Sequence, residues 1–238
     1  MRVFNLTIGS LVDENYIYAR ALSYLGVDFY DHHDRKLLEI CEEMNITKDQ
    51  VLKAFYLFDQ SHRFSFKELN KLPLQIVIEY LKHAHQQFIK DKLPYIARLI
   101  ARHQDLDDLK LIFPEFVDEF VNHIYEEEDT LFHYLDTLIK IDKGQHANPL
   151  AALWKHRSMR LKDVFEDHQE VDELAGIRNL AEEYQDQDIL ARVILQEIKA
   201  FDREMWYHAE IENKILFPKA IELEGQIWKR LTKLTRLN

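Results

Sequence analysis

Apolar residues recur every three or four positions along most of this chain, which is the period of an amphipathic α-helix. After residue 73 the pattern continues through four long segments, at about 74–103, 114–141, 149–184 and 187–224. Pro94 falls inside the first segment, where we expect a kink or a restart of the helix. Only 5 Gly and 5 Pro occur in 238 residues, so few positions break the helices. The pattern predicts an all-α fold whose larger part is an up-down four-helix bundle.

The beginning of the chain differs from the rest because its helical stretches are short and are separated by residues typical of caps and turns. The polar sequence DQSHRFSFKELNK follows at 59–71 and separates this part from the long segments. We therefore expect three parts: a small helical N-terminal domain at 1–60, a linker at 61–73, and the four-helix bundle at 74–238.

The charge of the chain restricts its partners. With 31 basic and 42 acidic residues, the net charge is −11. Such a surface repels nucleic-acid phosphates and anionic lipid, so we expect neither a nucleic-acid-binding nor a membrane-binding protein. The same charge is compatible with binding of metal cations.

The single cysteine, Cys41, excludes an intramolecular disulfide and any cysteine-based zinc or iron–sulfur site. It fits a reducing compartment. The N-terminus lacks the apolar run of a signal peptide, and no stretch of about 18 uncharged apolar residues exists. We therefore expect a cytoplasmic protein.

One motif, His-x3-Glu-x3-Leu-Phe, occurs twice. It is HIYEEEDTLF at 123–132 and HAEIENKILF at 208–217. Residues four apart lie one above the other on a helix. Each copy therefore brings an imidazole and a carboxylate to one face: His123 with Glu127, and His208 with Glu212.

Three further histidines, His85, His103 and His168, lie within apolar stripes of the other segments. A single histidine on an apolar face is usually satisfied by ordinary hydrogen bonds. A buried glutamate is rarer, because an unpaired carboxylate in a core is driven to take up a proton. Inward histidines on four helices, two of them followed by a glutamate, are better explained by one shared metal site.

The number of candidate ligands indicates two metal ions. The motif pairs, His168, and one or both of His85 and His103 provide six or seven groups, whereas one tetrahedral zinc needs four. Two octahedral irons, bridged by Glu127, Glu212 and an oxo or hydroxo group, would use them all. The imidazole-rich set favours iron over manganese, and zinc is a further alternative.

These motifs resemble those of hemerythrin-like proteins, and more closely those of the di-iron iron–sulfur cluster repair family. A His-x3-Glu-Glu motif is matched from His123 to Phe132, and an acidic-His motif by DHQE at 167–170. The late motif of the family is matched from His208 to Pro218, and its early histidine by His85, which precedes a Leu-Pro pair.

The N-terminal part also resembles the small helical domain of that family, with one departure. Tyr30, Asp31, His32 and His33 stand where the family has Cys-Cys-Gly-Gly. The thiol chemistry of that domain therefore does not carry over to this chain.

The resemblance implies a hemerythrin-like di-iron bundle that acts on iron–sulfur clusters damaged by nitric oxide or oxidants. The implied metal ligands are His85, His103, His123, Glu127, His168, His208 and Glu212. The implied partners are a small diatomic molecule (NO or O2), damaged iron–sulfur proteins and a second copy of the chain in a homodimer. An alternative is a sensor or store for O2, NO or iron without turnover, and a third is a bundle that has lost its metal. The motifs do not decide whether the protein is an enzyme.

Overall fold

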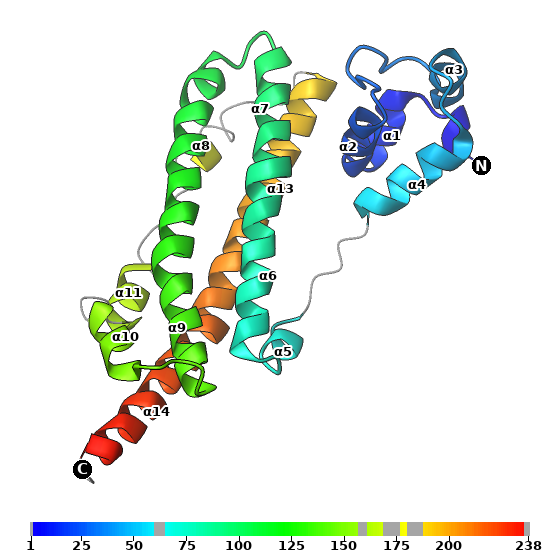
Figure 1. The fold of residues 1–238 in the computed structure, drawn as a ribbon. Helices are drawn as coiled ribbons and strands as arrows, with labels where there is room; N and C mark the ends of the chain where they lie inside the picture. Colours follow the sequence, from blue (N-terminus) through cyan, green and yellow to red (C-terminus); the bar gives the residue numbers. More distant parts are fainter. Residues whose placement is uncertain (1, 60–64, 157–160, 169–176, 180–187, 236–238) are drawn as a thin grey trace.

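The structure is a computed structural model that describes residues 2–59, 65–156, 161–168, 177–179 and 188–235. Over these residues the chain is helical and forms no β-strand, which confirms the expected all-α fold (Figure 1). Within the same residues, no helix is both long enough and apolar enough to cross a membrane.

Long helices form the bundle. The first rises as α6, η2 and α7, and the second descends beside it as α8, η3 and α9 (Figure 1). Two short helices, α10 and α11, pack near the lower end, and the last long helix descends as α13, η4 and α14. The bounds are α6 (Leu74–Gln87), η2 (Phe88–Lys92), α7 (Leu93–Arg102), α8 (Asp107–Glu127), η3 (Glu128–Phe132), α9 (His133–Asp142), α10 (Pro149–Lys155), α11 (Leu161–His168), α13 (Ile189–Ile211), η4 (Glu212–Leu216) and α14 (Phe217–Thr235).

Segments η2, η3 and η4 are π-helical turns, one in each of these long helices. A π-turn accommodates one extra residue and is frequent at functional sites. Pro94 and Pro218 each occupy the second position of the α-helix that follows such a turn. Proline cannot donate to the carbonyl four residues earlier and clashes with it, so a wider turn before the proline relieves both problems. The helix therefore restarts at Leu93, as Pro94 predicted.

Three of the long segments differ from their predicted bounds, the fourth because its last helix, α14, continues beyond residue 224 to Thr235. The second begins at Asp107 and not at Pro114, which lies inside α8. Pro114 is exposed, so water can solvate the carbonyl of Lys110 that loses its helical hydrogen bond. The third segment is not one continuous helix, because α10 ends at Lys155 and a new helix, α11, begins at Leu161.

The N-terminal helices are α1 (Ile8–Glu14), α2 (Ile17–Tyr24), α3 (Leu37–Glu43) and α4 (Lys48–Asp59). Their buried residues belong to the same apolar cluster as those of the adjoining half of the bundle, from Phe4 through Ile100 to Phe201. A second apolar cluster fills the other half of the bundle, around Phe132 and Phe217. The division of the chain into three parts remains a prediction.

Arg20 of α2 connects the N-terminal helices to the bundle. Its guanidinium lies 2.5 Å from Asp91 of η2 and 4.0 Å from Glu197 of α13, and it covers the ring of Tyr95. Burial raises the pKa of Glu197, and the charge of Arg20 opposes that rise. A second ion pair joins Asp13 to Arg192 at 2.7 Å. The N-terminal helices are thus held against two of the long helices by charged contacts as well as by apolar packing.

Candidate metal centre

Four side chains from three long helices converge inside the bundle. They are His85 of α6, Glu127 at the end of α8, His208 of α13 and Glu212 at the start of η4. Each offers one ligand atom, and these four atoms lie within 4.8 Å of one another. No other group of three or more His, Cys, Asp or Glu side chains converges in this way in the described part of the chain.

The imidazoles face each other through the same nitrogen. His85 Nε2 lies 3.0 Å from His208 Nε2. A carboxylate oxygen of Glu212 lies 2.9 Å from His208 Nε2, and one of Glu127 lies 3.4 Å from His85 Nε2. Both nitrogens and both carboxylates are therefore directed at one small region.

This polar group forms a layer between the two apolar clusters. His85 is 2%, His208 5%, Glu212 1% and Glu127 9% exposed. Each of the three helices passes from one apolar cluster to the other at this layer. On the first helix, Leu81 before His85 belongs to the cluster around Phe132, and Phe88 after it belongs to the cluster around Phe201. Buried carboxylates are costly unless a cation compensates them. The donor set and its burial are compatible with a bound metal ion.

The protonation of His85 suits ligation. Burial, together with the nearby His208, lowers the pKa of His85 to about 3. The imidazole is therefore neutral at physiological pH, and one of its nitrogens has a free lone pair. The other nitrogen, Nδ1, donates to the carboxylate of Glu128 at 2.9 Å.

Phenylalanine rings close the side of the centre that faces the N-terminal helices. Phe88 lies edge-on to His208, with ring centroids 5.7 Å apart, and also contacts Phe201 and Phe120. Phe116 packs against Phe120 and Phe201. Because these rings are buried, water and ions are excluded from that side.

Two other predicted ligands, His123 and His168, are not assigned to this group by the structure. His123 is on α8 one turn before Glu127 and is exposed, although it is close enough to His85 to contribute to the lowering of its pKa. His168 is the last residue of α11, and its side chain lies outside the described residues. Their assignment as ligands remains a prediction.

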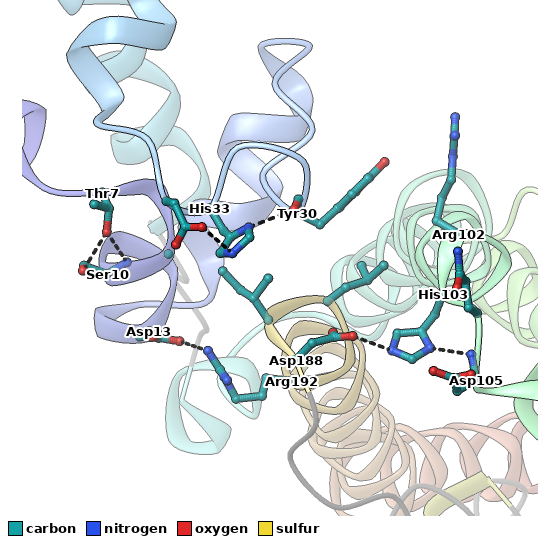
Figure 2. A pocket seen from close by; sticks show the side chains of 15 residues that line it. Thr7, Ser10, Asp13, Tyr30, His33, Arg102, His103, Asp105, Asp188 and Arg192 are labelled. Carbon is teal, nitrogen blue, oxygen red and sulfur yellow. Dashed lines mark hydrogen bonds and ion pairs between the residues drawn. The ribbon is translucent and has the colours of Figure 1, made fainter.

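The placement of His103 corrects one prediction. His103 follows α7, accepts from the Asp105 backbone N–H at 3.0 Å through Nδ1, and donates through Nε2 to Asp188 at 3.1 Å (Figure 2). Its distance from His85 along the sequence is five helical turns, which corresponds to roughly 27 Å along a helix axis. A shared helical face does not bring two residues into one site when they are so far apart along the axis.

His103 lines a pocket of about 660 Å³ between the N-terminal helices and the end of the bundle (Figure 2). His33, from the loop between α2 and α3, lines the same pocket. Its Nε2 lies 3.0 Å from Asp34, and its Nδ1 lies 3.3 Å from the Tyr30 carbonyl. Asp13, Asp34 and Asp188 each contact a neighbouring side chain. Among the described residues, no three His, Cys, Asp or Glu side chains converge here as they do inside the bundle.

Replacing His103 by alanine should leave the metal content unchanged and lower the stability. Asp188 caps α13 by accepting from the Ala191 backbone N–H, and His103 holds that carboxylate in place. We expect a loss of about 1–2 kcal/mol in the free energy of unfolding of the metal-free protein. Chemical denaturation and elemental analysis measure the two quantities. A metal content that falls in His103→Ala would instead restore His103 as a ligand.

The sequence motifs did not reveal the π-turns or the contact of Glu128 with His85. The prolines were a signal for two of the π-turns. Pro94 follows His85 by nine residues, and Pro218 follows Glu212 by six. Glu128 is one of four consecutive acidic residues, EEED at 126–129, and the sequence does not show which of them contacts a histidine.

Comparison with known proteins identifies relatives. An iron–sulfur cluster repair protein, ScdA, from Staphylococcus epidermidis is 24% identical over 207 residues, which are 82% of this chain and 88% of the relative. The protein of that name from Staphylococcus haemolyticus is 21% identical over 155 residues, or 60% of this chain and 65% of the relative. No family model matches the chain, and no solved structure matches it significantly. The chain is thus similar over most of its length to iron–sulfur cluster repair proteins, as its histidine and glutamate motifs predicted.

Proposed function

We propose that this chain is a non-haem di-iron protein that functions in iron–sulfur cluster repair under nitrosative or oxidative stress. The observation that carries this proposal is the buried convergence of His85, His208, Glu127 and Glu212. The similarity to two iron–sulfur cluster repair proteins supports it.

The ligand set that we propose extends beyond the four converging residues. Four ligand atoms alone would be enough for one tetrahedral zinc ion. Two irons require more, and we assign His123 and His168 to complete the set, with Glu127 and Glu212 as bridges. Manganese is a weaker candidate, because it prefers more oxygen ligands than this set provides.

The residues of the chain determine how such a site would be reached. The phenylalanine rings around Phe88 exclude water from one side, whereas exposed His123 and half-buried Glu128 lie toward solvent on another. When bound, iron would supply redox chemistry toward NO or O2, or would itself be the material given to a damaged cluster. NO, O2 and iron would therefore enter or leave the site from the side on which α8 lies.

We place this function in the cytoplasm, where a single buried cysteine stays reduced. The proposed partners are NO or O2 and proteins with damaged iron–sulfur clusters, and a homodimer is included in the proposal. The net charge of −11 is consistent with the absence of nucleic acid and membrane among them.

A repair assay tests the proposal. A [4Fe–4S] enzyme inactivated by nitric oxide is incubated with the iron-loaded protein, and its activity is followed. We expect recovery with the wild type and with His83→Ala, an exposed histidine outside the centre, and little recovery with Glu212→Gln. No recovery with the iron-loaded wild type, together with reversible NO binding, would favour the sensor or store instead.

A further inference from the structure

Segment η3 contacts the His85 ring at both of its ends. Glu128, the first residue of η3, accepts a hydrogen bond from Nδ1 of His85 at 2.9 Å. Phe132, the last residue, lies nearly parallel to the imidazole, with 5.6 Å between ring centroids and 7° between planes. His85 belongs to another helix, so both contacts are made between helices and depend on how the bundle packs.

The contact with Glu128 determines which nitrogen of His85 has the proton. A neutral imidazole has one N–H, and a carboxylate can only accept. The proton therefore lies on Nδ1, and the lone pair lies on Nε2. Nε2 is the nitrogen that faces His208 and Glu127.

The contact with Phe132 determines the plane of the ring. Phe132 is completely buried, whereas the side chain of Glu128 is 30% exposed. Packing alone therefore holds Phe132 in place, but burial does not force Glu128 toward His85. Glu128 could extend into solvent as its neighbours Glu126 and Asp129 do.

We propose that η3 positions His85 as a metal ligand, with Glu128 setting the tautomer and Phe132 the ring plane. This inference rests on the proposed function, because it assigns a role toward the same metal centre. Glu128 is a positioning residue: it acts through His85 and touches no reacting atom. A carboxylate bound to the far nitrogen of a ligating histidine typically strengthens metal affinity by about 10–100-fold.

The tautomer can be measured without any metal. Metal-free protein labelled with 15N-histidine is examined by NMR, and the His85 signals are identified by their absence from His85→Gln. We expect the Nδ1–H tautomer in the wild type and in Glu128→Gln, whose amide oxygen can still accept. In Glu128→Ala we expect a shift toward the Nε2–H tautomer. Glu126→Ala, an exposed neighbour, is the matched control and should resemble the wild type.

The same four proteins are then titrated with Co2+, whose visible bands report coordination. Glu128→Ala should bind about 10–100-fold more weakly than the wild type, and Glu128→Gln should retain most of the affinity. An Nε2–H tautomer in the wild type, or an unchanged tautomer in Glu128→Ala, would overturn the inference. Correct tautomer shifts with no Co2+ binding to any variant would overturn the proposed function, and with it the role toward a metal, while the tautomer assignment would stand.

Discussion

Glu212→Gln should remove much of the metal and should spare the stability of the metal-free protein. Glu212 is 1% exposed and contacts His208 Nε2 at 2.9 Å. Glutamine keeps the volume and removes the charge that a bridging ligand needs. A metal present at about 100 times its dissociation constant stabilises the fold by roughly 2.7 kcal/mol, and the variant should lose most of that stabilisation. Without metal, loss of a buried charge should be neutral or stabilising.

Elemental analysis and denaturation of the loaded and metal-free forms measure these effects. Glu210→Gln is the matched control, because Glu210 lies on the same helix and pairs with Lys214 near the surface. The control should retain its metal. Full metal content in Glu212→Gln, or an equal loss of stability in both forms, would rule out Glu212 as a bridge.

Phe201→Ala should cause the largest loss of stability of any single change considered. Phe201 is 2% exposed, and its ring lies 5.4 Å from Phe88 and 5.5 Å from Phe120. Truncating a buried phenylalanine leaves a cavity and costs about 3–5 kcal/mol. Since Phe88 packs directly on His208, the loosened cluster should also weaken metal binding.

Urea denaturation of the metal-free protein gives the free energy of unfolding. Trp206→Ala on the same helix is the control, because Trp206 is 62% exposed. We expect that change to cost less than about 1 kcal/mol. Similar losses in both variants would mean that the phenylalanine cluster is not a tightly packed part of the core.

The helical period predicted the fold class and the motif of His208 and Glu212 because both depend on residues within one turn. It failed for His103 because five helical turns separate that residue from His85 along the axis, and a π-turn, η2, also lies between the two. A π-turn shifts the angular phase of everything beyond it, so a face extrapolated over five turns is unreliable.

Contacts between distant parts of the chain could not be predicted from the helical period of apolar residues. The exposure of His123, in contrast to buried Glu127 one turn later, depends on how α8 packs against its neighbours. The ion pair of Arg20 with Asp91 likewise joins segments that no local pattern relates. Tertiary packing decides such features, whereas local spacing decides which residues can share a helical face.

The metal content per chain tests the central claim most directly. Protein purified from iron-replete cells is subjected to elemental analysis, and its visible spectrum is recorded. If the bundle core holds two octahedral irons, we expect about two irons per chain and the charge-transfer bands of an oxo-bridged pair. One zinc per chain, or no metal at all, would contradict the account.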